Sequence, residues 1–256
     1  MKTIDLNADL GEGFGHWRMG DDDAMLDVVT SANIACGFHA GDPNIMSRCF
    51  ALAKEKNVAI GAHVAFQDLI GFGRRLIPLS PTEITHAVCY QIGAAQALAR
   101  LNGARVSYVK AHGALANSAE INSSVAEAIA QAIKLSDASL SLLSIARSEQ
   151  THAGYRAGLQ IAHEIFADRA YSDDGRLLPR QHPDAIISDI NQIIDRMSIM
   201  LECQSLLTIG GKKLPTKIDS ICVHGDTPQA VNITQCLRAS LLGNGYSLRA
   251  FSQPAS

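Results

Sequence analysis

The sequence predicts an α/β fold in which seven parallel strands close into a TIM-like β/α barrel. Short apolar runs alternate with longer segments of helical period along the chain, which is typical of a parallel sheet with right-handed crossovers. Seven such units in 256 residues suit a closed barrel, complete or one strand short. An open doubly wound sheet is the alternative. This alternation continues evenly along the chain, so we expect a single domain over residues 1–256.

The expected strands are the seven short apolar runs. They cover residues 3–10, 32–37, 58–63, 106–112, 140–146, 160–167 and 220–224. Helices are expected between them, at residues 24–30, 43–56, 81–101, 123–135, 149–158, 183–200 and 228–242. The aspartates at 21–23, Pro43 and the SPTE run at 80–83 are typical of helix starts. The irregular stretches 63–81 and 171–182 have the length of active-site loops.

Composition narrows the class of protein. Apolar residues make up 47% of the chain, enough for a sizeable core, yet no run approaches the roughly 18 apolar residues of a membrane span. The first residues turn acidic at once, unlike a signal peptide. Six cysteines without a CxxC pair indicate buried thiols, not a disulfide framework. A net charge of −3 without a basic stripe argues against nucleic acid. We expect a cytoplasmic protein.

Four of the apolar runs lead into a histidine: His39, His63, His112 and His224. Successive strand residues point to opposite faces, so each run can be divided into an apolar row toward the helices and an inner row. The inner rows hold these histidines and further polar residues, namely Asp5, Asn7, Asp9, Lys110, Glu164 and Asp168. In a parallel barrel the carboxyl ends of the strands meet at one mouth, where substrate sites lie.

The alternative is that these histidines have no catalytic role. A single histidine at a strand end is more often a surface residue, or a core residue whose hydrogen bonds are satisfied. Matching parity at four strand ends, with Lys110 and Asp9 on the same rows, makes coincidence much less probable. We therefore predict one shared active-site pocket at the mouth.

Two kinds of chemistry fit this set. One is a divalent metal held by carboxylate and imidazole, with Asp9, His39, His63 and His112 as candidates. The other is metal-free acid–base catalysis by histidine, with Asp9 or Glu164 orienting a ring or acting as base. Lys110 would stabilise an oxyanion or bind an anion; the alternative is an internal ion pair with Asp9 or Glu164.

Two glycine-rich loops could bind anions. Arg74 follows the glycines of GFGRR, and GEGFG at 11–15 follows the first strand; an arginine fork or backbone amides suit an anion. Ordinary turns are as probable. The chain has no GxGxxG or GxxxxGK[ST] motif, so it shows no standard nucleotide site. Cys222 is the one cysteine on an inner row near the mouth, whereas Cys36 has core parity.

Six motifs in order resemble the LamB/YcsF family: DLNADLGEGFG, SANIACGFHAGDP, GAH followed by GFGRR, K-x-HGAL, E-x-FADRAY and CVHGDTPQAV. They extend from Leu6 to about Val231. The resemblance implies a seven-stranded barrel of the polysaccharide-deacetylase-like superfamily. It also implies ATP-dependent opening of 5-oxo-L-proline to L-glutamate, a 5-oxoprolinase reaction carried out with two partner subunits.

Strand parity and these motifs together give the expected site residues. The predicted catalytic residues are Asp9, His39, His63, Lys110, His112 and Glu164. The predicted substrate- or anion-binding residues are Asn7, Glu12, Asp42, Arg74, Asp168, Arg169, His224 and Asp226. Which residue acts as base and which as acid stays open. ATP is expected to be used together with the partners, and a divalent metal is possible.

The chain departs from the family pattern beside two histidines. GAHVAFQD replaces the usual GAHPSYPD, giving Val64, Ala65 and Gln67, and KAHGALAN replaces KPHGALYN, giving Ala111 and Ala116. Losing a proline changes the turn after the strand, and losing tyrosine removes an aromatic wall, so another lactam could be the substrate. The alternatives to a component of a 5-oxoprolinase are a metal-dependent amide hydrolase such as a deacetylase, or a non-catalytic lactam- or sugar-binding barrel.

Overall fold

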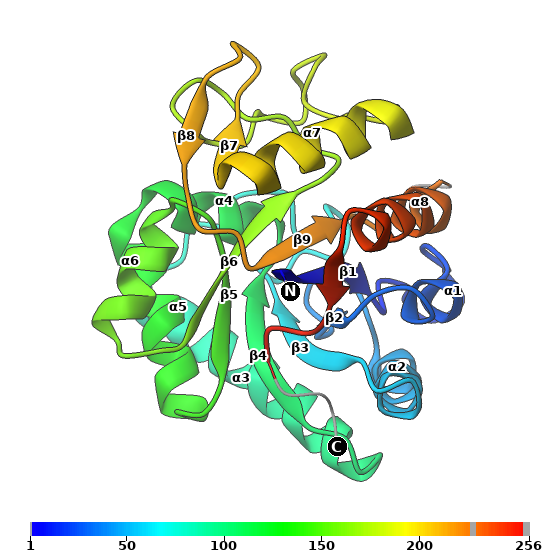
Figure 1. Cartoon of the computed structure of the whole chain (residues 1–256). Helices are drawn as coiled ribbons and strands as arrows, with labels where there is room; N and C mark the ends of the chain where they lie inside the picture. The colour runs from blue at the N-terminus through cyan, green and yellow to red at the C-terminus, as the bar shows by residue number, and fades with distance from the viewer. Residues whose placement is uncertain (1, 226–228, 253–256) are drawn as a thin grey trace.

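A computed structural model describes residues 2–225 and 229–252. Seven parallel strands form a closed barrel (Figure 1). They are β1 (Lys2–Leu10), β2 (Ser31–Ala35), β3 (Ala59–Val64), β4 (Val106–Ala111), β5 (Ser141–Ile145), β6 (Ile161–Phe166) and β9 (Ser220–Val223). Consecutive strands pair, and β9 pairs with both β6 and β1 and so completes the ring. The predicted seven-stranded barrel is confirmed, and the open sheet is excluded.

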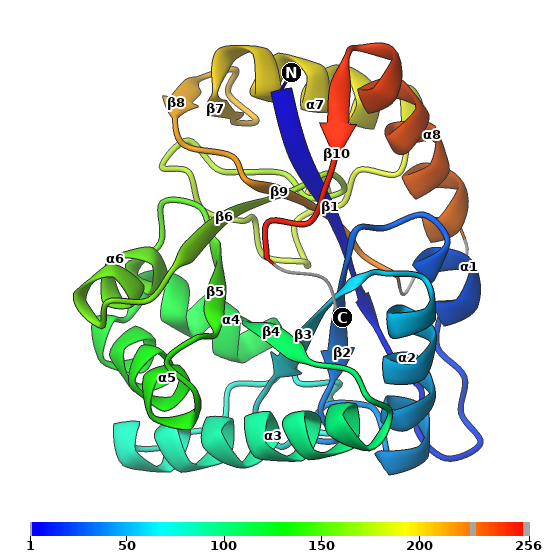
Figure 2. The same cartoon turned by 60° about the horizontal axis from the view of Figure 1, so that its bottom comes forward.

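Helices surround the strands (Figure 2). Those expected from the sequence are α1 (Asp22–Leu26), α2 (Pro43–Glu55), α3 (Pro81–Leu101), α5 (Ser123–Ser136), α6 (Glu149–Arg156), α7 (Ile190–Cys203) and α8 (Ala230–Gly243). The predicted start signals operate locally. Asp21 caps α1, and Ser80 and Glu83 form a reciprocal capping box at α3, satisfying backbone N–H groups that a helix start leaves free.

Several predicted boundaries were wrong. Helix α1 ends at Leu26 instead of residue 30, and α7 begins at Ile190, capped by Asp189, instead of at 183. Residues 226–228, where the last helix was expected to begin, lie outside the described residues. The sequence analysis missed α4 (Gly113–Ile121), the antiparallel ribbon of β7 (Ser205–Leu207) and β8 (Lys213–Pro215), and β10 (Tyr246–Leu248) beside β1. All four are short and give little periodic signal.

The strand rows face as predicted. The apolar row of β1, including Leu6 and Leu10, belongs to a large core between the strands and the helices. A second, small cluster of Ala59, Tyr108, Leu143 and Ala162 fills part of the barrel interior. The remaining inner positions are largely polar, so the barrel holds a buried hydrogen-bonding network where a simple core would be apolar.

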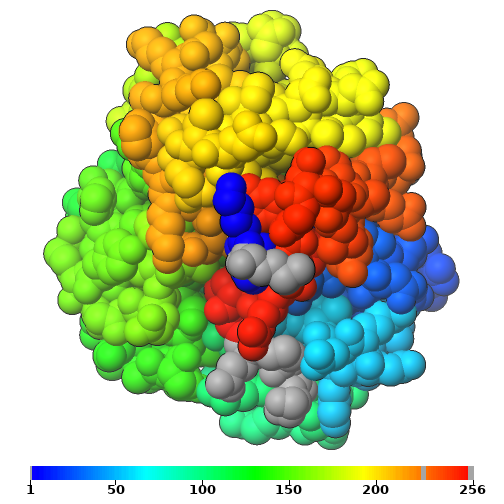
Figure 3. Space-filling model, viewed as in Figure 1, coloured from blue at the N-terminus to red at the C-terminus, as the bar shows by residue number. Residues whose placement is uncertain are grey.

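The end of the chain covers one end of the barrel. Phe251 packs on the inner cluster, with its ring centroid 4.9 Å from that of Tyr108, and the amide of Arg249 donates to the carbonyl of Ile4 at 3.1 Å. Figure 3 shows the last described residues, in red, lying across the middle of this face. This segment covers the amino-terminal end of the strands, opposite the mouth.

The structure bears on two expectations from composition, one about membrane-spanning helices and one about the cysteines. Within the described part of the chain, each helix is too short or too polar to span a lipid bilayer. None of the six cysteines is in a disulfide, as expected; Cys36, Cys49 and Cys222 are buried, but Cys203 is exposed, contrary to the expectation of buried thiols.

Candidate functional site

The floor of the barrel interior is a polar network, joined to the mouth through Asn33, which donates to Asp9 Oδ1 at 2.8 Å. Asp5 accepts hydrogen bonds from the hydroxyls of Thr30, Ser31 and Ser220. Asn7 donates to Ser220 at 2.7 Å and accepts from Asn33 at 2.7 Å. Burial outweighs these hydroxyl donors and raises the pKa of Asp5 to about 6. The floor groups use each other as partners, which is what buried polar groups require.

Lys110 lies one layer above, between two carboxylates. Its Nζ is 2.9 Å from Asp9 Oδ1 and 2.8 Å from Glu164 Oε1. Burial alone would lower the pKa of Lys110, but the negative charges of Asp9 and Glu164 raise it well above its usual range. The sequence analysis proposed Asp9 or Glu164 as the partner, and the structure has both. The ammonium is thus a fixed positive charge at the base of the mouth.

Cys222 touches the same ammonium, with Sγ 3.2 Å from Lys110 Nζ. Burial is the main reason that the pKa of this thiol is raised well above its usual range, and it outweighs the nearby lysine. A nucleophilic cysteine needs its thiolate form. Cys222 therefore serves as packing around Lys110.

Three histidine rings and Glu12 form a compact cluster beside Asp9. Glu12 Oε1 is 3.0 Å from His39 Nε2, and His63 Nε2 is 3.0 Å from His112 Nδ1. The outer nitrogens meet backbone carbonyls: His112 Nε2 is 2.9 Å from Phe72 O and His63 Nδ1 is 3.3 Å from Lys110 O. Burial lowers the pKa of His39 to about 3, and it holds that of His112 well below its usual range.

The loop after β3 fits tightly against these rings. Gly73 has φ +64°, and a Cβ there would lie 2.7 Å from His39 Cβ and 2.9 Å from His112 Cδ2. The glycine of GFGRR is thus needed for conformation and for space. Arg75 pairs with Asp68, and Arg74 lies over the ring of Phe72 at 4.9 Å while lining the cavity.

The cluster offers a donor set that could hold a divalent metal. One atom each of Glu12, His39, His63 and His112 lie within 4.8 Å of one another. Ligands of a tetrahedral zinc-sized ion stand about 3.3 Å apart. However, the rings of His39 and His112 stack with centroids 3.8 Å apart and an angle of 11° between their planes. A histidine binds a metal in the plane of its ring, so one of these rings has to turn before both can bind the same ion. Glu12 replaces Asp9 in this set, because Asp9 is engaged by Lys110.

His224 and Asp168 form a separate pair on the other side of the mouth. His224 Nδ1 lies 2.8 Å from Asp168 Oδ2 and 3.0 Å from Oδ1, and its ring stacks on Phe166. The other ring nitrogen is left for the cavity that His224 lines. A carboxylate on one nitrogen fixes the tautomer and orientation of the ring, which is the arrangement of an acid–base histidine.

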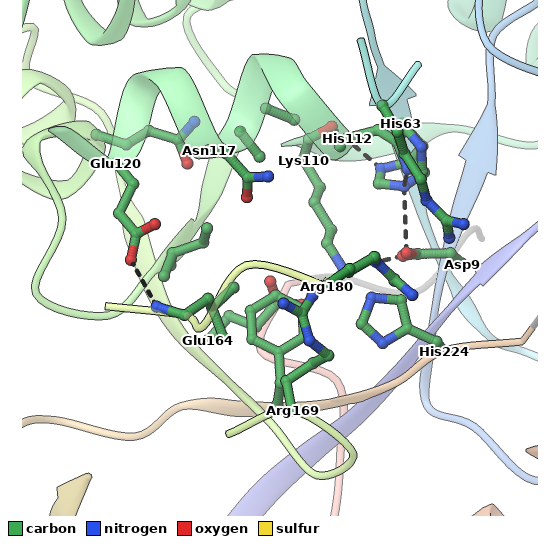
Figure 4. Close-up of a pocket in the computed structure, with 18 of the residues that line it drawn as sticks. Asp9, His63, Lys110, His112, Asn117, Glu120, Glu164, Arg169, Arg180 and His224 are labelled. Atoms are coloured by element: carbon green, nitrogen blue, oxygen red, sulfur yellow. Dashed lines mark hydrogen bonds and ion pairs between the residues drawn. The ribbon is translucent and has the colours of Figure 1, made fainter. Parts of the chain in front are cut away.

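These groups surround a cavity of about 390 Å³ at the mouth. Figure 4 shows Lys110 in its middle, with Asp9, His63, His112 and His224 toward one end and Asn117 and Glu120 toward the other. Of the predicted site residues, the lining includes Asp9, His63, Arg74, Lys110, His112, Glu164, Arg169 and His224. His39, Glu12 and Asp168 stand directly behind lining residues.

Two predicted residues, Asn7 and Asp42, are not brought into the cavity, and the position of a third is not described. Asn7 belongs to the floor. Asp42 is the N-cap of α2 and accepts from the amides of Asn44 and Ile45, so its carboxylate is used for helix capping. Asp226 lies outside the described residues.

Sequence reasoning missed five polar lining residues: Asn117, Glu120, Gln150, Arg180 and Gln181. Asn117 and Glu120 are on α4, the helix that was not predicted, and had it been, their spacing would have placed them on one face. Among the departures from the family pattern, Ala111 and Ala116 line the cavity, Val64 and Ala65 are buried, and Gln67 is exposed.

Comparison with known proteins gives full-length matches. The model of the LamB/YcsF family matches residues 4–256. A 5-oxoprolinase subunit from Gluconobacter oxydans is 51% identical over 98% of this chain and 99% of its own, and one from Azorhizobium caulinodans is 50% identical over 98% and 100%. The crystal structure of a lactam utilization protein from Thermus thermophilus has a TM-score of 0.92 at 38% identity, covering 98% of this chain and 100% of its own.

A more distant match concerns the fold alone. The catalytic domain of a peptidoglycan N-acetylglucosamine deacetylase from Eubacterium rectale has a TM-score of 0.52 at 13% identity, covering 100% of this chain and 91% of that one. This match shows that the two chains share the barrel fold.

Proposed function

The chain belongs to the LamB/YcsF family, and from this premise we propose that it is one component of an ATP-dependent 5-oxoprolinase. The substrate is 5-oxo-L-proline, the product is L-glutamate, and the work is shared with two partner subunits. The observation that carries this proposal is the match, at about half of all positions over nearly the whole length, to relatives that are named as subunits of 5-oxoprolinase.

The reaction has to overcome amide resonance. Phosphorylation of the lactam oxygen by ATP turns that oxygen into a leaving group and makes the ring carbon electrophilic. Water then adds to this carbon, and the ring nitrogen leaves once it has received a proton. A second water cleaves the resulting acyl phosphate into L-glutamate and inorganic phosphate. The site must therefore stabilise negative charge, activate water and supply a proton. The nucleotide is bound with the partner subunits, because the chain has no standard phosphate-binding motif.

We assign the charge-stabilising role to Lys110. Its ammonium is buried, held in place by Asp9 and Glu164, and faces the cavity. A donor fixed in a dry site needs no rearrangement as charge develops on the substrate. Arg74 and Arg169, which line the same cavity, bind the transferred phosphoryl group.

Proton transfer falls to the two histidine groups. His224, oriented by Asp168, delivers a proton to the departing ring nitrogen. Asp9 orients the attacking water, and the proton passes to the ring of His63, 3.3 Å from Asp9 Oδ2. Burial raises the pKa of Asp9, but the charges of His63 and Lys110 outweigh it and hold that pKa well below its usual range, so Asp9 is ionised and able to orient the water.

A second candidate function is a metal-dependent amide hydrolase. The observation in its favour is the donor cluster of Glu12, His39, His63 and His112. A divalent ion there would supply Lewis-acid polarisation of an amide oxygen. This candidate predicts tightly bound metal and turnover without ATP.

The deciding experiment measures glutamate release from 5-oxo-L-proline by the chain reconstituted with its two partner subunits. We expect turnover that needs ATP and all three chains, and little or none from this chain alone. Elemental analysis of the same sample and an assay without ATP test the hydrolase. Lactam binding without turnover under every condition would indicate the non-catalytic barrel.

A further inference from the structure

The cavity is larger than the proposed lactam requires. 5-Oxoproline has nine non-hydrogen atoms and takes up roughly 200 Å³, given somewhat less per atom than the ~30 Å³ of a liquid water molecule. The cavity holds about 390 Å³. The groups assigned to the chemistry gather toward one end, as Figure 4 shows. The other end, the far lobe, is where Asn117 and Glu120 of α4 lie. Leu177 is hydrogen-bonded to Glu120, and α6, which carries the lining residue Gln150, packs against α4.

One face of α4 builds most of the far lobe. Glu120 lies three positions after Asn117 and four after Ala116, so it neighbours both on the helix surface. Ala116, which precedes Asn117 on α4 and lines the cavity, has a small side chain and so takes up little of this space. Across the lobe, the amide of Leu177 donates to Glu120 Oε1 at 3.3 Å. The lobe therefore has apolar walls and a few polar groups, which is typical of a ligand subsite.

Gln150 gives independent evidence that this lobe accepts a ligand. It enters from α6, is 2% exposed, and its Nε2 has no hydrogen-bond partner among the described residues. A buried amide N–H without an acceptor costs about 1–3 kcal/mol. Such a group persists where a bound molecule or water completes it, and Gln150 lines the cavity.

Charge restricts what the lobe can take. The lining includes four cationic side chains, which disfavour a positively charged ligand group. They are Arg74, Lys110, Arg169 and Arg180. Glu120 disfavours an anion at the far end whenever it is ionised; burial raises its pKa to about 7. A neutral group with both hydrogen-bond donors and acceptors is repelled neither by the cationic side chains nor by Glu120. Its carbonyl accepts from Gln150 or Asn117, and its N–H groups donate to Glu120.

We propose that the far lobe binds a neutral carboxamide substituent carried by the lactam, so that the substrate class extends from free 5-oxoproline to its amide conjugates. This inference rests on the proposed function for the lactam-binding end. It assigns Gln150 and Glu120 to recognition of the substituent, with Ala116 providing the space.

The test compares four ligands by isothermal titration calorimetry on the chain reconstituted with its two partner subunits: free 5-oxoproline, neutral 5-oxoprolylglycinamide, anionic 5-oxoprolylglycine and the cationic 5-oxoprolyl conjugate of ethylenediamine. We expect the neutral conjugate to bind at least tenfold tighter than each of the others. If free 5-oxoproline binds as tightly as the neutral conjugate, the inference is wrong while the proposed function stands. If none of the four binds, both are wrong.

Variants then locate the effect. Gln150→Met should reduce the preference for the neutral conjugate over free 5-oxoproline about fivefold, the scale of one hydrogen bond. Glu120→Gln should improve binding of the anionic conjugate relative to the neutral one by a similar factor. Gln131→Met, on the exposed surface of α5, is the matched control and should change neither ratio. Equal ratios in the parent, Gln150→Met and Glu120→Gln would overturn the assignment.

Discussion

The floor and the mouth of the barrel interior are built from the same rows of the same strands, but their polar groups are used differently. Asp5 and Asp9 stand four residues apart on the inner row of β1. Asp5 is surrounded by three hydroxyl donors and keeps a raised pKa, about 6. Asp9 faces Lys110 and His63, and its pKa is held well below the usual range in spite of burial.

The difference lies in unused bonding capacity. Among the described residues, the buried side-chain atoms that lack a hydrogen bond include His39 Nδ1 and Gln150 Nε2 at the mouth, and none from Asp5, Asn7 or Asn33 of the floor. Glu164, also at the mouth, is held by its ion pair with Lys110. A network that satisfies itself fixes a structure, whereas one with groups to spare is able to bind and react. Substitutions at the mouth should therefore reduce catalysis, and those at the floor should reduce stability.

The largest expected effect is at Lys110. In the reconstituted complex, Lys110→Met should lower turnover by roughly a hundredfold or more, the scale for losing one electrostatic stabiliser. Because the single variant leaves Asp9 and Glu164 buried without their cation, the double variants with Asp9→Asn or Glu164→Gln should recover folding but not activity. Lys134→Met, exposed on α5, is the control. A double variant that folds and turns over near the parental rate would mean that Lys110 is only an ion-pair residue.

At the other side of the mouth, His224→Gln should reduce kcat by about a hundredfold, the low end for a lost acid–base group. Asp168→Asn keeps the ring but loses the carboxylate that orients it, so its loss should be smaller and in the same parameter. Steady-state kinetics of both variants measures this. If Asp168→Asn proves the more damaging, the assignment of His224 as the proton donor must be abandoned.

At the floor, Asp5 should contribute a pH-dependent stability. Its pKa rises from about 3.8 to about 6 on folding, so the folded chain binds more protons than the unfolded chain between these values. The contribution is fully present below pH 3.8 and is lost as the pH rises through 6. Relative to the parent, Asp5→Asn should gain stability from pH 4 to 7, by at most ~3 kcal/mol. Urea unfolding across this range checks it, and a pH-independent difference would contradict the raised pKa.

The smallest effect is expected at Tyr108, whose hydroxyl donates to Asn33 Oδ1 at 2.7 Å. Tyr108→Phe leaves that acceptor without this donor and should cost about 1–3 kcal/mol of stability. Turnover per folded molecule should be unchanged, since Tyr108 belongs to the floor. A loss of kcat without a loss of stability would remove the distinction between floor and mouth.

The sequence predicted the strands better than the helices. All seven barrel strands were located because alternation and apolar runs are strong local signals. Helix α4 was missed because its start follows directly on His112 at the end of β4, with no side-chain cap. As a result, the sequence analysis also missed two residues that line the cavity, Asn117 and Glu120, because both are on that helix. The ribbon of β7 and β8 and the segment at Phe251 depend on contacts far away in the sequence.

What the sequence determined by itself is the alternation of inward and outward side chains, which is a property of the extended backbone, and therefore the set of polar residues in the barrel. It also determined the family, through motifs extending along most of the chain. Only the tertiary structure decided which of those residues meet. It gave Lys110 two carboxylates, put Glu12 in place of Asp9 among the three histidines, and used Asp42 as a helix cap. The reason is that parity fixes the face on which a side chain lies, whereas barrel closure and strand register fix which residue of a neighbouring strand stands at the same height.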